Sequence, residues 1–374
     1  MWVSQLELVN FRSYEKLAIE LSPQNIALVG HNGRGKTNLV EAIGFAATHS
    51  SHRVANSTAL IRKGSDQSVI RLRTVNPDGS GAMLELEINE GRPNRVRVNR
   101  NQLPRLRDAL GQLRCVVFAP EDLRLIKGDP SDRRRFTDDI MVQVAPRYAG
   151  VRAEYDKAVR QRNTLLRSGR ADQSALDVWD EQLVRIGSEL AWGRRNAWRR
   201  LDEHVAAMYD VISAESGSAS ALYRSVAQGA ASLEEVASAM TEELARRRRE
   251  ELARGITLVG PHRDDVDFRL DGHPARSYAS HGESWSLALA VKLASFRVLA
   301  DLAGDPPVLI LDDVFAELDE QRRQQLLESI SDADQVIATA AVRSDIPEGF
   351  ASRWITIDRA DERSAVTYDD GQGV

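Results

Sequence analysis

Short apolar pulses separated by polar residues fill the first 120 positions, and this pattern predicts strands. Residues 83–89, MLELEIN, alternate with period two, and RVRVNRNQL at 95–103 is predicted to be their hairpin partner, turning near Asn99 to Asn101. The run CVVFAP at 115–120 predicts a short buried strand that Pro120 ends. Similar pulses occur at Leu6, Leu8 and Phe11, at Ile19 and Leu21, and at Ile26 to Val29.

Between about residues 133 and 254 the apolar positions recur at intervals of three and four, which is typical of amphipathic helices. One apolar stripe predicts a helix from about Ser174 to Ser213, roughly 60 Å long at about 1.5 Å per residue. A second helix is predicted from Leu233 to Leu252. The first stripe consists of Leu183, Ile186, Leu190, Ala197, Leu201, Val205 and Met208.

Strand patterns return after about residue 255. VLILDD at 308–313 is predicted as a buried strand that follows a helix from Ser284 to Leu302, and QVIATA and WITIDR are predicted as further strands. The pattern therefore predicts an α/β protein whose sheet-rich head is made from both ends of the chain. We expect residues 1–125 and 256–374 to form this head, and residues 126–255 to form an inserted helical arm domain.

Composition narrows the classes of protein that remain. The 374 residues carry a net charge of −5 and 42% hydrophobic residues, which is ordinary for a globular protein and gives no global signal for nucleic-acid binding. Cys115 is the only cysteine, so no internal disulfide is expected, and its apolar neighbours place it in a core. No run approaches the roughly 20 apolar residues that cross a bilayer, and the histidines lack the spacing of metal ligands. We expect a soluble cytoplasmic protein.

The segment GHNGRGKT, residues 30–37, has the G-x-x-x-x-G-K-T spacing of a phosphate-binding loop. Its glycines let successive backbone N–H groups face phosphates, and the positive end of the following helix adds to the attraction. Lys36 is predicted to reach the β- and γ-phosphates, and the Thr37 hydroxyl to hold Mg²⁺. A chance glycine-rich turn is the alternative, but the strand before and the helix after the loop favour a nucleotide. The predicted nucleotide-binding residues are Gly30, His31, Asn32, Gly33, Arg34, Gly35, Lys36, Thr37 and Asn38.

The acids that end VLILDD are the second half of this predicted site. A buried strand delivers Asp312 to the carboxyl edge of the sheet, where ligands bind, so it is predicted to hold Mg²⁺. Asp313, the next residue, is predicted to be the catalytic carboxylate that polarises the attacking water. Helix capping is an alternative reading for such acids, and it suits Glu317 or Asp319 better than Asp312. Because Lys36 and Asp312 lie near opposite ends of the chain, a simple phosphotransferase is disfavoured.

SYASHGESW, residues 277–285, contains a third element. Ser280 and Glu283 form a capping box, S-x-x-E, at the start of an amphipathic helix. The same serine and Gly282 present a hydroxyl and bare N–H groups, which suit an anionic γ-phosphate. A role as a helix cap and a role as a phosphate contact are compatible for these residues.

Several clusters of basic residues occur in the helical region, with acidic residues between them. Most such runs are solvated helix faces, but at least one is expected to contact DNA phosphates. The candidates are Arg133, Arg134 and Arg135, then Arg194 and Arg195, then Arg199 and Arg200, and finally Arg246, Arg247, Arg248 and Arg249.

Three separated motifs give the chain a specific resemblance. PEDLRLIKGDPSDRRRFTD at 120–138, GPHRDD at 260–265 and LDDVFAELD at 311–319 resemble the RecF family of SMC-like repair ATPases. The resemblance implies an ABC-type P-loop head of mixed sheets and helices, with a short helical arm. It also implies ATP and Mg²⁺ as cofactors, slow DNA-stimulated ATP hydrolysis and an ATP-dependent homodimer. The implied partners are double-stranded DNA and single-/double-strand junctions without sequence preference, RecR with RecO, and RecA indirectly.

The resemblance also assigns residues. Ser280 and Gly282 match the signature that meets the nucleotide of the opposite subunit, and Asp319 matches an aspartate that reaches across the dimer. Arg12 matches an arginine that contacts nucleotide in some relatives, with a plain surface charge as the alternative. Arg133 to Arg135 lie within a family motif, so they are also candidates for the head–arm junction.

The signature departs from the family pattern. The family reads close to S-Q-G-Q-Q-R, whereas this chain reads Ser280-His281-Gly282-Glu283-Ser284-Trp285. Glu283 places negative charge near a γ-phosphate, and we expect the repulsion to be modest if its carboxylate turns back into the capping box. Thr339 stands where ABC relatives often have histidine.

Three other functions use a similar phosphate loop. In a nucleotide-binding subunit of an ABC transporter the phosphate loop and the acidic strand normally lie closer together. A small-molecule kinase would need an acceptor pocket that the sequence does not indicate. A non-hydrolysing ATP-bound DNA clamp or scaffold stays open, because Asp313 stands where many ABC relatives have glutamate.

Overall fold

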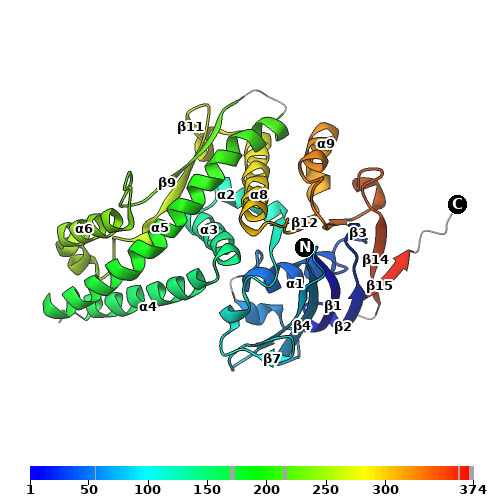
Figure 1. The fold of residues 1–374 in the computed structure, drawn as a ribbon, viewed down its shortest axis with the longest axis horizontal. Helices are drawn as coiled ribbons and strands as arrows, with labels where there is room; N and C mark the ends of the chain where they lie inside the picture. The colour runs from blue at the N-terminus through cyan, green and yellow to red at the C-terminus, as the bar shows by residue number, and fades with distance from the viewer. Residues whose placement is uncertain (55, 169–172, 214–216, 361–362, 370–374) are drawn as a thin grey trace.

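The computed structural model describes residues 1–54, 56–168, 173–213, 217–360 and 363–369 (Figure 1). Its strands are β1 Trp2–Phe11, β2 Tyr14–Glu20, β3 Asn25–Val29, β4 Gln67–Val75, β5 Gly81–Asn89, β6 Arg95–Val98, β7 Asn101–Gln102, β8 Cys115–Phe118, β9 Ala219–Arg224, β10 Asp265–Leu270, β11 His273–Pro274, β12 Val308–Asp312, β13 Val336–Ala340, β14 Arg353–Ala360 and β15 Arg363–Asp369. Its α-helices are α1 Lys36–Thr48, α2 Leu123–Lys127, α3 Pro130–Val144, α4 Arg147–Arg167, α5 Gln173–Ile212, α6 Leu233–Arg254, α7 Ala275–Tyr278, α8 His281–Ala303 and α9 Glu320–Ser329. Short 3-10 turns are η1 Ser57–Leu60, η2 Leu106–Ala109, η3 Pro120–Asp122, η4 Pro261–Arg263, η5 Val314–Glu317 and η6 Arg343–Asp345.

A mainly parallel sheet forms the centre of the head, with strand order β15-β14-β3-β13-β12-β8. The N-terminal strand β3 lies between two C-terminal strands, since Ile26 pairs with Ile337 of β13 and with Arg353 of β14. Strand β8 closes the other edge against β12. The prediction that both ends of the chain build one head is confirmed.

A second, antiparallel sheet of order β2-β1-β4-β5-β6-β7 faces the first across helix α1. The predicted hairpin is confirmed: β5 pairs with β6, and the turn into β7 uses Asn99 and Arg100, both with positive φ. Apolar residues from α1 and from both sheets share one core. Cys115 is buried there as expected, and burial raises the pKa of its thiol to about 12.

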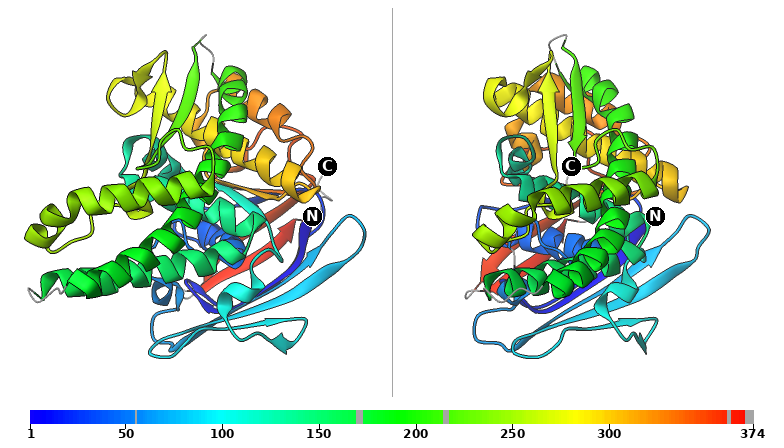
Figure 2. Two further views of the ribbon diagram at one scale, coloured as in Figure 1. Left: turned by 60° about the vertical axis from the view of Figure 1, so that its left-hand side comes forward. Right: turned by 90° about the vertical axis from the view of Figure 1, so that its left-hand side faces the viewer.

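The arm consists of α4, α5 and α6, which lie side by side and project from the head (Figure 1, Figure 2). Helix α5 has 40 residues, so the long predicted helix is confirmed, as is the helix from Leu233. Arg162 of α4 is fully buried and binds Asp180 of α5 at 2.7 Å and Glu251 of α6 at 2.6 Å. These pairs lock the three helices together, because a buried cation must keep its partners. Among the described residues no helix is long and apolar enough to span a membrane.

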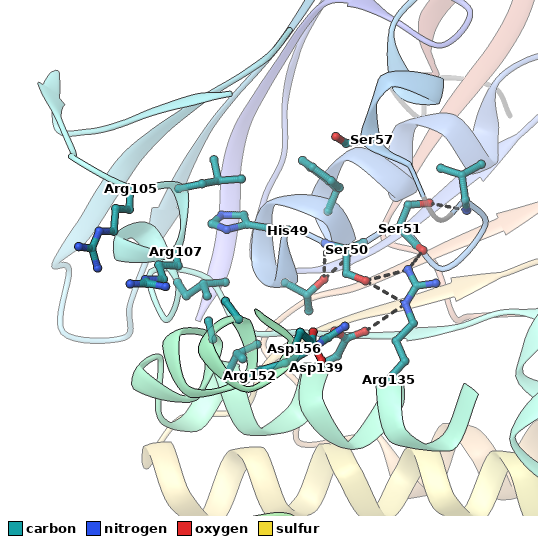
Figure 3. A pocket seen from close by; sticks show the side chains of 18 of the residues that line it. His49, Ser50, Ser51, Ser57, Arg105, Arg107, Arg135, Asp139, Arg152 and Asp156 are labelled. Carbon is teal, nitrogen blue, oxygen red and sulfur yellow. Dashed lines mark hydrogen bonds and ion pairs between the residues drawn. The ribbon is translucent and has the colours of Figure 1, made fainter. Parts of the chain in front are cut away.

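Two of the family motifs meet at the junction between head and arm. Arg133 donates from Nε and Nη2 to the carboxylate of Asp265, over 2.6 and 3.1 Å. Arg134 donates to the backbone oxygen of Asp264 at 2.8 Å, and Arg135 reaches Ser50 at the end of α1 (Figure 3). Arg133 is only 3% exposed. The prediction that Arg133 contacts DNA is therefore wrong: its buried guanidinium holds the junction, the alternative that the motif itself offered. The DNA contact of Arg134, which is only partly buried, stays a prediction.

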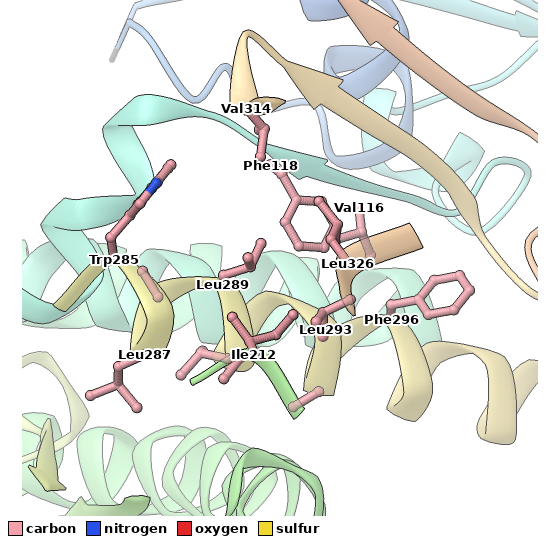
Figure 4. Close-up of a cluster of buried hydrophobic side chains, with 14 of the residues drawn as sticks. Val116, Phe118, Ile212, Trp285, Leu287, Leu289, Leu293, Phe296, Val314 and Leu326 are labelled. Atoms are coloured by element: carbon pink, nitrogen blue, oxygen red, sulfur yellow. The ribbon is translucent and has the colours of Figure 1, made fainter. Parts of the chain in front are cut away.

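A single apolar core runs from the head into the arm. Along α8, Leu289, Leu293 and Phe296 pack on β8 and α9, and Ile212 of α5 reaches the same cluster (Figure 4). Trp198, Leu201 and Val205 of α5 belong to it as well. The expected division at residues 125 and 255 stays a prediction, because this core crosses both parts.

Candidate functional site

The glycine-rich loop joins the end of β3 to the start of α1 at Lys36, as the motif predicts. A Cβ at Gly30 would overlap the carbonyl oxygen of Ile357, and Gly35 has φ +116°, where a Cβ would come within 2.5 Å of the Ser364 hydroxyl. Glycine is required at both positions, because the neighbouring strands β14 and β15 press against the loop. Lys36 Nζ lies inside the loop, 2.7 Å from the oxygen of Gly30.

The remaining loop residues divide into an exposed tip and a packed base. His31, Asn32 and Gly33 are exposed, and the Asn32 side chain lies 3.4 Å from Lys36 Nζ. Arg34 faces Asp358 at 3.6 Å, whereas Asn38 donates to the Ser13 hydroxyl at 2.8 Å. The tip is thus open to a ligand, while its base is anchored to the second sheet.

Asp312 closes the site from the other half of the chain. Its Oδ1 accepts hydrogen bonds from Thr37 Oγ1 at 3.0 Å and from Thr339 Oγ1 at 2.7 Å. Burial raises the pKa of Asp312 to about 6, and the charge of Asp313 adds to the effect. A hydroxyl and a carboxylate this close are hard oxygen donors, which fit Mg²⁺. The expected meeting of Thr37 and Asp312 is confirmed.

Thr339 organises both acids from the neighbouring strand β13. Its hydroxyl accepts from the backbone N–H of Asp313 at 2.9 Å and lies 3.3 Å from Asp313 Oδ1. Asp313 has φ +53°, in the left-handed region that side chains rarely adopt. The chain therefore turns sharply after Asp312, and both carboxylates lie close to the same threonine hydroxyl.

Arg12 has a structural partner. Its guanidinium donates to both carboxylate oxygens of Glu41 in α1, over 2.9 and 2.8 Å, and to the oxygen of Ala59 at 2.9 Å. Glu41 is fully buried, and although burial opposes ionisation, hydrogen bonds from Arg12 and Ser51 keep the pKa of Glu41 below its usual value. Arg12 is thus a partner of α1, and its contact with nucleotide stays a prediction.

The signature element begins α8 with the expected capping box. Ser280 Oγ accepts from the N–H of Glu283 at 3.2 Å, and the Glu283 carboxylate accepts from the N–H of Ser280 at 2.7 Å. The hydrogen bond from Ser280 lowers the pKa of Glu283. The carboxylate therefore turns back onto the helix start, which is the arrangement expected to limit its repulsion of a phosphate. Ser280 itself is exposed.

Lys127 holds the segment that precedes Ser280. Its ammonium donates to three backbone oxygens, those of Ala275 at 3.1 Å, Arg276 at 3.1 Å and Ala279 at 2.7 Å. Lys127 lies within the first of the three family motifs, but the motif alone assigns it no role. Lys127 is the last residue of α2, the short helix that follows β8, and its partners lie about 150 residues further along the chain.

Asp319 caps helix α9. Its Oδ1 accepts from the N–H of Arg322 at 2.8 Å, and its Oδ2 from Arg322 Nη1 at 2.8 Å. A Cβ at Gly282 would lie 4.0 Å from the Arg322 guanidinium. The signature helix and the Asp319 turn are therefore neighbours, joined through Arg322.

The arginine run of α6 does not act as one patch. Arg246 is 66% exposed and pairs with Glu243 at 2.5 Å, Arg247 pairs with the same glutamate, and Arg249 is exposed. Arg248 instead binds Asp177 and Asp180 of α5 at 2.7 and 2.5 Å. The prediction that Arg248 contacts DNA is corrected, because its side chain joins two arm helices. Arg246 and Arg247 stay predicted contacts.

The chain is similar along nearly its whole length to proteins of one family. Residues 2–358 match the family described as RecF/RecN/SMC N terminal domain. The DNA replication and repair protein RecF of Arthrobacter sp. (strain FB24) is 45% identical, over 96% of this chain and 97% of its own. That of Frankia alni is 49% identical, over 93% of this chain and 95% of its own.

Solved structures agree with this relationship. The recombination mediator protein RecF with ATP, of the RecFOR pathway, superposes with a TM-score of 0.90 at 26% identity, over 98% of this chain and 97% of that one. An SMC head bound to the C-winged helix domain of ScpA has a TM-score of 0.58 at 17% identity, which shows a shared fold. The chain therefore belongs to the RecF family of SMC-like ABC ATPases.

Proposed function

We propose that this chain is an ATP-driven DNA clamp of recombinational repair and replication. ATP with Mg²⁺ joins two copies head to tail, the closed dimer holds DNA at single-strand gaps, and slow hydrolysis releases it. The hydrogen bond between Thr37 and Asp312 carries the proposal, since it brings the phosphate loop and the predicted Mg²⁺ aspartate together within one chain. The relatives named for DNA replication and repair, and the RecF structure with ATP, support the biological setting.

Each residue has a stated task in this proposal. The loop N–H groups and Lys36 would bind the β- and γ-phosphates, and Thr37 and Asp312 would hold Mg²⁺, which neutralises phosphate charge. Asp313 would orient the attacking water and accept its proton, with Thr339 fixing the direction of the carboxylate. Exposed Ser280 would donate to the γ-phosphate held by a second copy, and Asp319 would contact that copy.

The dimer follows from the place of Ser280. Its hydroxyl is exposed at the start of α8 and accepts the capping hydrogen bond from the N–H of Glu283. Exposed Tyr278 and His281 flank it. Two copies related by a twofold axis would bury two nucleotides between them, and a signature contact that exists only with ATP gives the nucleotide its differential affinity for the dimer.

The partners implied by family membership complete the proposal. The clamp would bind duplex DNA and single-/double-strand junctions through phosphates, without sequence preference, in the cytoplasm. It would act with RecR and RecO to favour loading of RecA.

Sedimentation velocity tests the central step. With ATP and Mg²⁺ the chain should form dimers, above all as Asp313→Asn, which should retain ATP, and with ADP it should be monomeric. Ser280→Arg should bind ATP yet remain monomeric, because a bulky side chain blocks the signature contact. An equal monomer fraction in ATP and ADP would refute the clamp. If Asp313→Asn dimerises and hydrolyses ATP as fast as the parent, the scaffold reading with incidental turnover gains support.

A further inference from the structure

A cavity of about 860 Å³ opens at the head–arm junction, and we call it the junction pocket. The head contributes the end of α1 and the turn η2, and the lining is completed by α3 and by the start of the arm helix α4 (Figure 3). Helix α1 begins at Lys36 and ends at Thr48, so its far end is roughly 20 Å from the phosphate loop at about 1.5 Å per residue. The junction pocket is thus separate from the ATP site.

Four arginines and two aspartates give the pocket its charge: Arg105, Arg107, Arg135, Arg152, Asp139 and Asp156. Arg135 and Arg152 are already engaged, the first with Ser50 and the second with Asp138 at 3.4 Å. Arg105 and Arg107 have no acidic partner among the residues that the structure describes. The lining is therefore net cationic.

An apolar floor lies beside these charges. Phe45, Leu106, Leu110 and Val142 line it. His49 points into the same space (Figure 3), and its buried Nε2 has no hydrogen-bond partner within the described part of the chain. Burial lowers the pKa of His49 to about 4, so the ring is neutral and Nε2 needs one polar partner.

We propose that the junction pocket binds a nucleotide 5′-phosphate, with the phosphate at Arg105 and Arg107 and the base on the apolar floor beside His49 Nε2. Arginine binds phosphate oxygens in a bidentate manner, which the two unpaired guanidinium groups permit. A planar base with a polar edge matches an apolar floor that carries one unpartnered nitrogen. Cavities of about 300–1,000 Å³ hold ligands of this size.

The nucleotide has two sources, a free mononucleotide or the phosphorylated end of a nucleic-acid strand. Head and arm both line the pocket, so either ligand would strengthen the junction. Arg107 of the head lies against the arm, since a Cβ on Gly150 of α4 would be 3.5 Å from its guanidinium carbon. Binding here needs no dimer, and it is therefore independent of the clamp proposal.

Calorimetric titration of the full chain, with the ATP site filled by ADP and Mg²⁺, tests the proposal. The probes are thymidine 5′-monophosphate, 5′-phosphorylated trithymidylate and the same trinucleotide without the phosphate. Saturable binding of the mononucleotide supports a free ligand, and binding of the phosphorylated trinucleotide alone supports a strand end. Equal binding of the unphosphorylated trinucleotide, or no saturable binding of any probe, overturns the proposal.

Variants locate the ligand. The double variant Arg105→Ala, Arg107→Ala should weaken binding at least tenfold while its melting temperature stays unchanged. The control is Arg92→Ala, Arg95→Ala, which removes the same charge from exposed positions outside the pocket. His49→Phe keeps the ring but removes Nε2, and should weaken binding several-fold. Unchanged affinity in the double variant, or an equal loss in the control, overturns the assignment.

Discussion

Thr37 and Asp312, 275 positions apart in the sequence, are joined by a 3.0 Å hydrogen bond from the threonine hydroxyl to the aspartate carboxylate. Thr37 lies in the first turn of α1, and Asp312 ends β12. The strand β3 that leads into the loop is separated from β12 by β13 alone. The register of three strands therefore sets the geometry of the cation site, with Thr339 of β13 between its two halves.

Replacing Asp312 should lower ATPase activity without lowering the stability of the fold. Asp312→Asn removes the carboxylate that we propose as a Mg²⁺ ligand, so ATP turnover should fall by at least about 100-fold. The variant should be at least as stable as the parent, and up to about 2 kcal/mol more stable. The reason is that burial raises the pKa of Asp312, so keeping its carboxylate ionised at neutral pH costs folding free energy that asparagine does not cost.

ATPase assays and urea unfolding without nucleotide measure the two effects. Asp210→Asn, at an exposed aspartate in α5, is the matched control and should change neither. A loss of stability in Asp312→Asn equal to its loss of activity would show that the acid is structural.

Thr339→Val should slow hydrolysis while ATP still binds. Valine keeps the shape of threonine but removes the hydroxyl that lies between Asp312 and Asp313. We expect kcat to fall about tenfold or more, since the water-orienting carboxylate loses its support, and the nucleotide dissociation constant to change little. Thr339→Ser restores the hydroxyl and should recover most of kcat. If Thr339→Val keeps kcat while Thr339→Ser loses it, packing of the β-branched side chain is the cause, and not the hydroxyl.

Local patterns predicted much of this molecule, because they depend on neighbours in sequence. The phosphate loop, the capping box at Ser280 and the 40-residue helix α5 all follow from spacing alone. The tertiary partners of a side chain do not follow from spacing. Arg133 resembles a surface charge in the sequence, yet Asp265 lies on a strand that folds against it 132 positions later. The role of Lys127 could not be predicted for the same reason, because its three acceptors are backbone oxygens, which every residue type carries.

Within the arginine run of α6, exposure should decide which residues bind DNA. Arg246→Ala, Arg249→Ala should weaken duplex binding and reduce the slope of log K against log salt concentration by about 1–2, as expected when two phosphate contacts are lost. Its unfolding free energy should change by less than about 0.5 kcal/mol. Binding is measured by fluorescence anisotropy over a range of salt concentrations.

Arg248→Ala is the control within the same run. It should lower the unfolding free energy by about 1–2 kcal/mol, discounted for partial exposure, because Arg248 joins α6 to Asp177 and Asp180 of α5. Its salt slope should stay unchanged. The opposite result, a changed slope only in Arg248→Ala, would place the DNA on the face of the arm between α5 and α6.

His262 should make the arm junction sensitive to acid. Its Nε2 lies 3.0 Å from the oxygen of Thr257, which can only accept, so Nδ1 accepts from Tyr155 at 2.7 Å. Burial lowers the pKa of His262 from 6.5 to about 4, so the folded protein binds this proton more weakly than the unfolded chain. The stability is fully present above pH 6.5 and is lost as the pH falls toward 4.

This histidine should contribute about 2 kcal/mol to the loss of stability between pH 7.5 and pH 5, from its pKa difference. Urea unfolding at the two pH values gives the loss. His262→Gln should be less stable at pH 7.5 but should lose less on acidification, while His273→Gln, on an exposed hairpin, should match the parent. Equal acid losses in parent and His262→Gln would assign the effect to other groups, such as buried His49 and His52.

Lys127 should control the signature serine from outside the ATP site. Lys127→Met removes three hydrogen bonds to Ala275, Arg276 and Ala279, which fix the segment before Ser280. ATP should still bind a monomer with unchanged affinity, because the phosphate loop is untouched. The dissociation constant of the ATP-bound dimer should rise about tenfold or more, and turnover should fall in proportion to the dimer that is lost. Lys63→Met, which removes an exposed lysine elsewhere in the head, should leave both unchanged. Raising the protein concentration should rescue turnover in Lys127→Met if the lysine positions Ser280. A defect that persists in the fully dimeric variant would instead place Lys127 in the chemistry of hydrolysis.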